Sequence, residues 1–160
     1  SNPLRDRFGS IFKLNFYSVN ELSEIVLRSS KILNLKITNE IANFVAKRAR
    51  GTPRIANRIL KRVRDFSQVA KKEVDKTFIT EVLNKLGIND LGLDSEDLKY
   101  LEVLKVKFNG GPVGLSTLSA ALSEDQQTID EFIEPYLLQL GLIKRTSKGR
   151  VFNSVLPLHV

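Results

Sequence analysis

The sequence predicts a mainly α-helical protein, with a small helical bundle followed by a winged-helix domain. Three observations predict this fold. Helix start signals and glycine stops divide residues 18–87 into four short helices. Further start signals divide residues 95–140 into three more helices. Residues 142–153 carry two short apolar segments around a turn, as a β-hairpin does, and three helices followed by a hairpin is the order of a winged helix.

The first 17 residues are expected to be the end of a larger domain. The segment from Pro3 to Gly9 is short and turn-like. Residues 11–17 then alternate apolar and polar side chains, which is the period of a strand. A lone strand is not stable without neighbours in a sheet, and the following sequence supplies few. We therefore expect that the chain begins inside a domain whose remainder is missing.

Residues 18–87 are expected to form the bundle of four helices. Ser18 to Glu21 is a capping box, and Thr52-Pro53 combines a hydroxyl N-cap with proline at the first helical position. Gly51 and Gly87 act as stops. The expected helices run from Ser18 to Leu33, from Thr38 to Arg50, from Thr52 to at least Phe66, and from Thr77 to Leu86.

Residues 88–94 are expected to be a linker, and residues 95–160 the winged-helix domain. The start signal of this domain is the cap at residues 94–97, and its first helix is expected to end at residues 109–111. Helices are then expected over residues 115–122 and 125–140, the latter kinked at Pro135. Residues 146–149 are the expected turn of the hairpin.

Composition limits the possible functions. The chain is 42% hydrophobic and 27% charged, which suits a packed core. It has no cysteine and one histidine, His159, so we expect no disulfide, no metal site and no Ser-His-Asp triad. No apolar run approaches the roughly 20 residues of a membrane span, and no signal peptide opens the chain, so a cytoplasmic protein is expected. The net charge of +7 favours a polyanion, nucleic acid first; the alternative is a solvated basic surface.

The start of the third helix is a candidate anion site. Backbone N–H groups at a helix start favour anions, and Arg54 in the first turn can donate to a phosphate. Taken alone, these residues favour a plain capped helix with a surface arginine. The same helix carries a basic row of Arg54, Arg58 and Arg62, with Lys61 and Arg64 beside it. Such a row can face DNA, but the solvated side of an amphipathic helix is the favoured interpretation.

The hairpin is a candidate DNA contact. Lys144, Arg145, Lys148 and Arg150 fall within seven residues, and because crowded like charges gain nothing structurally, a phosphate partner is the better explanation. Residues 123–141 hold five carboxylates and no lysine or arginine. In many helix-turn-helix proteins the last helix enters the major groove, but here phosphates would repel it. We therefore expect that the wing, rather than this helix, touches DNA.

Several segments together resemble the RuvB family of hexameric AAA+ ATPases, which act with RuvA and RuvC on four-way Holliday junctions. The similarity covers nearly the whole chain. The matching segments are Pro3 to Gly9, Phe16 to Val19, Arg48 to Asp65 (RARGTPRIANRILKRVRD), Phe108 to Leu115 and Ile133 to Gln139. The resemblance implies that residues 1–17 end an AAA+ core and that residues 18–87 are its lid.

The resemblance also implies roles for single residues. Arg7 matches the arginine finger that reaches the ATP of a neighbouring subunit, Tyr17 a nucleotide-contacting tyrosine, and Arg54 the sensor-2 arginine of the lid. Arg145 and Arg150 match DNA-contacting arginines of the wing. These roles replace the plainer interpretations, in which Arg7 is an exposed arginine and Arg54 a surface arginine on a plain capped helix. Lys148 departs from the arginine expected there; it keeps the charge but loses the forked donor.

The resemblance implies ATP and Mg²⁺ as cofactors of a complete motor. No G-x-x-x-x-G-K-[ST] loop occurs in these 160 residues, so we do not expect them to hydrolyse ATP alone. Two alternatives stay open. One is the lid and winged helix of another AAA+ DNA-binding protein, such as a replication initiator. The other is a stand-alone regulator or interaction module with no link to ATP.

Overall fold

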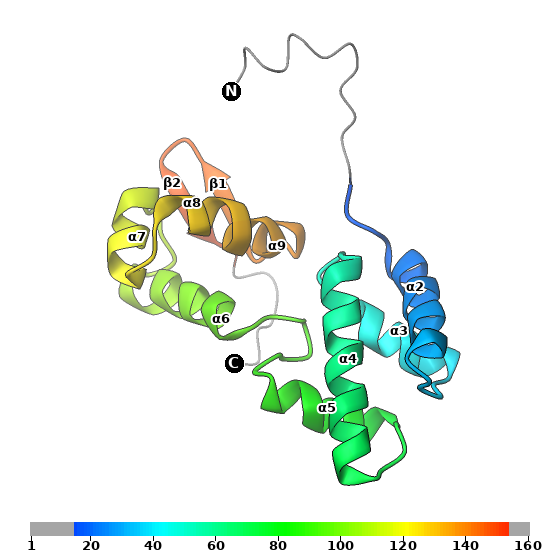
Figure 1. Cartoon of the computed structure of the whole chain (residues 1–160). Helices are drawn as coiled ribbons and strands as arrows, with labels where there is room; N and C mark the ends of the chain where they lie inside the picture. Colours follow the sequence, from blue (N-terminus) through cyan, green and yellow to red (C-terminus); the bar gives the residue numbers. More distant parts are fainter. Residues whose placement is uncertain (1–14, 154–160) are drawn as a thin grey trace. The chain divides into compact units, whose positions relative to one another are not determined.

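The structure of the protein is a computed structural model that describes residues 15–153 (Figure 1). The expected strand over residues 11–17 lies mostly outside this range, and residues 15–17 are not in a strand. The chain divides into two compact units, and the boundary between them in the sequence lies between Lys76 and Thr77. In the part of the chain that the structure describes, no helix is long and apolar enough to cross a membrane.

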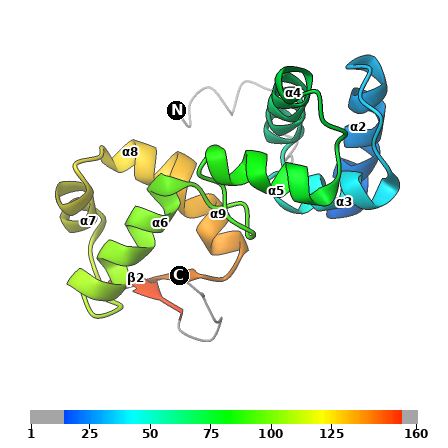
Figure 2. The ribbon, with the colours of Figure 1, turned by 90° about the horizontal axis from the view of Figure 1, so that it is seen from below.

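The first unit is a bundle of three helices packed against one another: α2 (Val19–Ile32), α3 (Asn39–Lys47) and α4 (Pro53–Ala70) (Figure 2). All three are amphipathic, and each buries one face. Their apolar faces form the core of the unit. The fully buried members of this core include Val26, Ala42, Val45, Ala56, Ile59, Leu60 and Val63.

The helix starts of the first unit follow the sequence signals, with one correction. Ser18 and Glu21 form the expected capping box, and the Thr38 hydroxyl accepts from the backbone of Ile41. Thr52 stands at the N-cap of α4, before Pro53, but its hydroxyl does not cap the helix. It donates instead to the Ala49 carbonyl oxygen at 3.3 Å, because the tight turn before α4 brings that oxygen within reach.

The helix α5 (Lys76–Lys85) and the segment after it lead into the second unit. Gly87 ends the helix with φ +67°, a left-handed conformation that favours glycine. The segment expected to be a linker folds into a turn: the Asn89 side chain accepts from the backbone of Leu91 at 3.0 Å and of Leu93 at 2.9 Å. Leu93 is buried in the core of the second unit.

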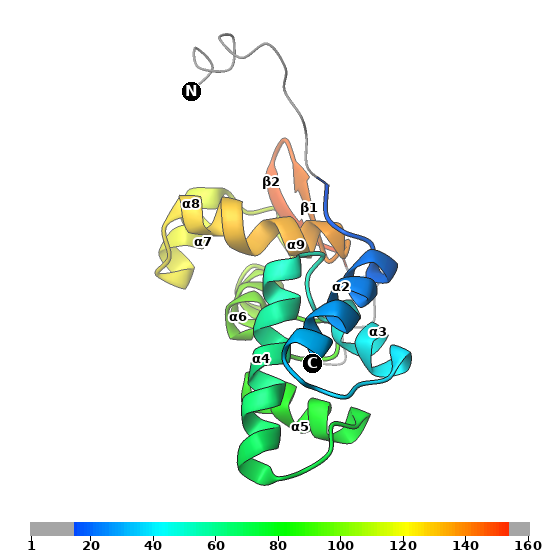
Figure 3. The same cartoon turned by 45° about the vertical axis from the view of Figure 1, so that its right-hand side comes forward.

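The second unit has the predicted order of three helical segments and a hairpin. The first segment is α6 (Ser95–Glu102), capped by Asp94, and continues as the π-helical turn η1 (Val103–Lys107). The second is α7 (Leu115–Leu122), and the third joins α8 (Gln126–Thr128), the π-helical turn η2 (Ile129–Ile133) and α9 (Glu134–Gln139). The hairpin follows, with β1 (Ile143–Thr146) antiparallel to β2 (Gly149–Phe152). The hairpin tip projects beyond the run from α8 to α9 (Figures 1 and 3).

Pro135 causes the expected irregularity of the third helical segment. Proline lacks an N–H group, and its ring collides with the carbonyl four residues earlier in a regular helix. The chain widens into η2 immediately before it, and the Glu134 N–H bonds to the Ile129 carbonyl, one residue further back than in an α-helix. This wider turn contains Asp130 and leads directly into Glu134.

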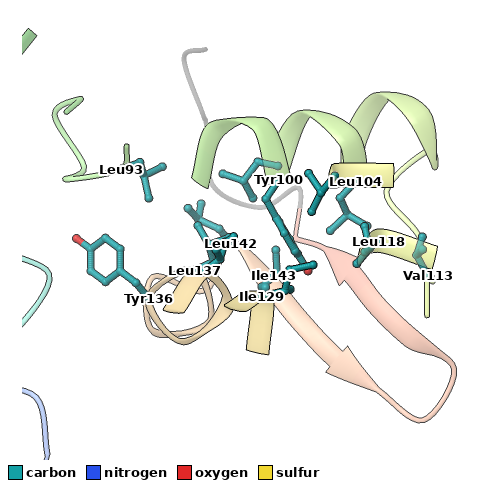
Figure 4. Close-up of a cluster of buried hydrophobic side chains, with 13 residues drawn as sticks. Leu93, Tyr100, Leu104, Val113, Leu118, Ile129, Tyr136, Leu137, Leu142 and Ile143 are labelled. Atoms are coloured by element: carbon teal, nitrogen blue, oxygen red, sulfur yellow. The ribbon is translucent and has the colours of Figure 1, made fainter. Parts of the chain in front are cut away.

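A single hydrophobic cluster holds the helices and hairpin of the second unit together (Figure 4). Tyr100 and Leu104 enter it from α6 and η1, Leu118 from α7, Leu137 from α9, and Ile143 from β1. All five side chains are at most 1% exposed. The hairpin is thereby fixed to the helices at its base, while residues 144–148, three of which are charged, are exposed.

Candidate nucleotide and DNA interfaces

The hairpin places Arg145 and Arg150 directly opposite each other. They form one cross-strand pair of the β1–β2 ladder, and the next pair, Thr146 and Gly149, closes the two-residue loop. Like charges at such a pair repel each other unless a counter-charge lies between them. The structure supplies two counter-charges, both from the helical segment before the hairpin.

The first counter-charge is Glu134, whose side chain is 0% exposed. Its two carboxylate oxygens accept from Arg145 Nε at 2.6 Å and from Arg150 Nε at 2.9 Å. The Tyr100 hydroxyl donates to the same carboxylate at 3.0 Å. A buried carboxylate is tolerated only when it is paired and hydrogen-bonded in this way. Burial of Tyr100, together with the charge of Glu134, raises the pKa of the tyrosine well above its ordinary value.

The second counter-charge is Asp130, one helical turn earlier and 46% exposed. One of its oxygens lies 2.7 Å from Nη2 of Arg145 and 3.6 Å from Nη2 of Arg150. Glu134 therefore takes the Nε groups of both arginines and also accepts from Nη2 of Arg150 at 3.4 Å, whereas Asp130 pairs mainly with Nη2 of Arg145. The two arginines differ in exposure: the side chain of Arg145 is 40% exposed and that of Arg150 17%.

The segment after η1 fixes the backbone of Arg150. Val113 forms a β-bridge with Arg150, with N–H to O distances of 3.0 Å and 2.8 Å in the two directions. Gly111 has φ +92°, and a Cβ there would lie 2.3 Å from the Arg150 carbonyl oxygen. Only glycine allows the two backbones to approach this closely. The motif of residues 108–115 thus holds β2 in register with the helices.

The structure corrects two steps of the argument from charge. Carboxylates do compensate the wing arginines, so a phosphate is not needed to explain why Arg145 and Arg150 lie together. The carboxylates of residues 123–141 do not all repel phosphate either, because Glu134 is buried, Asp130 is paired with the wing, and Asp125 caps α8. Three of the four predicted wing residues, Lys144, Arg145 and Lys148, are exposed, and Arg150 is partly buried.

Sequence reasoning missed Tyr100, Asp130 and Glu134 as members of this cluster. A local signal for the two carboxylates was present. They are four residues apart, which places both on one helix face. The link from Glu134 to arginines 11 and 16 residues later depends on how the hairpin folds back, and no local pattern carries that information.

The first unit brings Tyr17 to the start of α4. The Tyr17 N–H donates to the Gly51 carbonyl oxygen at 2.9 Å. The two segments line a hollow of about 230 Å³, formed by Asn15, Phe16, Tyr17, Gly51, Thr52 and Pro53. Arg54 follows in the first turn of α4 and is exposed. Arg7, the predicted arginine finger, lies outside the described residues.

The chemistry of this hollow fits part of a nucleotide but not a metal ion. The first turn of α4 has no side-chain cap, so its N–H groups can receive an anion. The exposed ring of Tyr17 can contact a base or sugar. Within residues 15–153, no group of three or more His, Cys, Asp or Glu side chains can hold a metal.

Two family models match the chain in succession. The model of the RuvB AAA lid domain matches residues 17–89, and that of the RuvB C-terminal winged-helix domain matches residues 90–154. Two RuvB subunits of the Holliday junction branch migration complex are similar to this chain. The subunit from Rickettsia africae is 51% identical over 96% of this chain, and that from Trichormus variabilis is 50% identical over 100% of it. The chain belongs to the RuvB family.

A solved structure agrees with this RuvB assignment. The RuvB Holliday junction branch migration motor of Thermotoga maritima superposes with a TM-score of 0.92 at 44% identity over 96% of this chain. The chain spans about half the length of the RuvB proteins it matches: 45% and 44% of the two curated relatives, and 52% of the Thermotoga chain. Membership of the RuvB family confirms the predicted resemblance and fold class, and it decides against the lid and winged helix of another AAA+ family.

Proposed function

We propose that this chain is the lid and DNA-binding part of an ATP-driven motor that moves Holliday junctions during recombination and repair. The observation that carries the proposal is the pair of arginine forks, Arg145 and Arg150, which Glu134 holds side by side on an exposed wing. Their arrangement suits a phosphodiester backbone, because guanidinium forks match the geometry of phosphate oxygens. The names of the relatives support the choice of a Holliday junction as the substrate.

The wing is proposed to grip phosphates rather than read bases. A motor that moves along any sequence gains nothing from base contacts, since each is worth about 1–3 kcal/mol and would hold the motor at one site. Phosphate contacts position a protein without reading sequence. Lys144 and Lys148, both exposed, add further donors of this kind.

The lid is proposed to sense nucleotide through Tyr17 and Arg54. ATP with Mg²⁺ supplies a transferable phosphoryl group; its binding loop and metal ligands would come from a core outside these 160 residues. Tyr17 and the start of α4 would contact that nucleotide within their own subunit, and Arg7 would reach the nucleotide of the next subunit. This arrangement requires a ring, for which we propose a homo-hexamer that works in the cytoplasm with RuvA and RuvC.

DNA binding by the chain tests the proposal. Fluorescence anisotropy is measured with two duplexes of unrelated sequence. Replacing Arg145 and Arg150 together by alanine should weaken binding by about tenfold for both duplexes alike, because only phosphate contacts are lost. Replacing Gln126 and Gln127, at the exposed start of α8, is the matched control and should change little. Selective loss on one duplex from the glutamine changes would identify α8 as a sequence reader and contradict the proposal.

ATP turnover is the second test. These residues contain no phosphate-binding loop, so the purified chain should release no phosphate from ATP above background, with or without junction DNA. Magnesium-dependent turnover that DNA stimulates and that survives further purification would contradict this division of labour.

A further inference from the structure

Asp130 occupies the position where a ligand of the wing arginines would bind. Its carboxylate is 46% exposed and lies across the Nη2 ends of Arg145 and Arg150, at 2.7 Å and 3.6 Å. Glu134 accepts from the neighbouring Nε groups of both arginines and, at 3.4 Å, from Nη2 of Arg150, and it is not exposed. The cluster therefore has a permanent inner carboxylate and an accessible outer one.

The charges of the cluster balance. Two guanidinium groups face two carboxylates, and a DNA phosphodiester carries the same single negative charge as Asp130. If a phosphate replaces Asp130, the two arginines keep the same number of counter-charges. This matters most for Arg145, whose Nη2 lies 2.7 Å from Asp130, because Arg150 keeps two hydrogen bonds to Glu134. A partly buried pair of guanidinium groups that keeps only one of its two counter-charges is less stable, so exchange of one anion for another is the easier route.

We propose that Asp130 is an internal competitor that occupies the binding position of a DNA phosphate, and that Glu134 is the positioning residue that keeps both arginines oriented toward that position. The inference rests on the proposed DNA grip of the wing and assigns opposite effects to two carboxylates of one helical segment. DNA binds by displacing Asp130 from the Nη2 ends. On release, Asp130 returns, and neither arginine has to wait for a counter-ion from solvent.

The test compares variants that change the charge equally. Asp130→Asn, Glu131→Gln and Glu134→Gln each remove one negative charge from the same helical segment. Glu131 is exposed and accepts from the Gln127 side chain, so it controls for charge alone. Affinity for one duplex is measured by anisotropy on the 160-residue chain at low salt, after circular dichroism has verified folding of each variant.

Asp130→Asn should raise affinity about twofold to fivefold, the range that an exposed ion pair is worth. Glu131→Gln should raise it by less than about 1.5-fold, because an unpaired surface charge is screened. Glu134→Gln should lower affinity although it removes the same negative charge, because one of the two acceptor oxygens becomes an NH2 donor that faces an arginine N–H. Glu134→Asp keeps the charge but shortens the side chain, and it should also lower affinity.

A double-mutant cycle isolates the competition. In a chain that already carries Arg145→Ala and Arg150→Ala, the gain from Asp130→Asn should fall to that of Glu131→Gln. The inference is overturned if Asp130→Asn gains no more than Glu131→Gln in the chain with both arginines, or if Glu134→Gln strengthens binding as much as Asp130→Asn. Failure of the proposed function is a separate result: the double arginine variant would then bind as tightly as the unchanged chain.

Discussion

The two arginine groups of this molecule are held in opposite ways. In the lid, Arg54, Arg58 and Arg62 form one exposed row along α4. In the winged-helix unit, Arg145 and Arg150 lie opposite each other on the hairpin and share a buried carboxylate. Both groups produce a similar basic signal in the sequence, yet only the second is fixed in orientation by a built network.

This difference shows what charge patterns can and cannot indicate. An exposed row on a helix is free to adapt and needs no partner to fold. A pair of arginines aligned across two strands needs a counter-charge before any ligand arrives. The arginine pair of the wing is therefore held in one orientation by its own counter-charges, whereas in the α4 row only Arg54, at the helix start, has a specific expected role.

The largest expected effect concerns nucleotide hydrolysis, which should depend on the segments before the winged-helix unit and not on the wing. Arg7→Ala in a full-length RuvB protein should lower ATP turnover by about 10³ to 10⁵, as loss of an arginine finger does. Nucleotide binding should be largely retained. Mixing these subunits with subunits that lack the lysine of the phosphate-binding loop should restore some turnover. No restoration in proven mixed rings would contradict action between subunits.

Stability of the wing should depend on its buried carboxylate. Glu134→Ala leaves Arg150 and the Tyr100 hydroxyl without their shared acceptor, so the free energy of unfolding should fall by about 3–5 kcal/mol. Glu131→Ala, three residues earlier and exposed, should change it by less than about 0.5 kcal/mol. Urea unfolding followed by circular dichroism measures both. Equal losses for the two variants would show that the network is not what stabilises the hairpin.

Replacement of two glycines with positive φ compares how rigid the backbone is in the two units. Gly111→Ala places a Cβ 2.3 Å from the Arg150 carbonyl oxygen, which already accepts a hydrogen bond from the Val113 N–H. Gly51→Ala meets the Phe16 side chain at 2.8 Å, but residues 15–20 are exposed and can shift. Gly111→Ala should cost about 3 kcal/mol and Gly51→Ala about 1 kcal/mol in unfolding free energy. The reverse order would contradict a rigid wing.

The Tyr100 hydroxyl gives a smaller effect with a pH signature. Tyr100→Phe should cost about 1.5 kcal/mol at neutral pH, the value of a hydrogen bond to a charged group. The pKa of Tyr100 is raised in the folded state, so its contribution is present below the unfolded-state value of about 10 and is lost as pH rises above it. The difference in stability between the chain and this variant should therefore shrink above about pH 10. Unfolding at a series of alkaline pH values measures this difference in stability. A difference that stays constant with pH would contradict the role given to the Tyr100 hydroxyl.

Local signals in the sequence predicted most helix starts. The side chains at Ser18, Thr38 and Asp94 cap helices as expected, because capping depends on residues within one turn. The turns η1 and η2 were not predicted, since their apolar spacing does not differ clearly from that of an α-helix. Pro135 signalled an irregularity but not its form.

The functional clusters were predictable to different degrees. The basic residues of the wing could be found because they lie within seven positions of each other. The acceptors that orient them could not, because Glu134 reaches Arg145 and Arg150 only after the hairpin folds onto α9 and after Tyr100 packs from α6. Likewise, the contact between Tyr17 and Gly51 joins segments 34 residues apart. Such contacts depend on tertiary packing, which periodicity does not record.

The salt dependence of DNA binding tests the central claim most directly. Anisotropy titrations across a salt series compare the unchanged chain with two double variants of equal charge: Arg145→Ala with Arg150→Ala in the wing, and Arg58→Ala with Arg62→Ala on α4. The wing variant should flatten the plot of log affinity against log salt by roughly 0.9 for each lost phosphate contact. The α4 variant should leave the slope nearly unchanged. A flatter slope for the α4 variant, with an unchanged slope for the wing variant, would contradict the account.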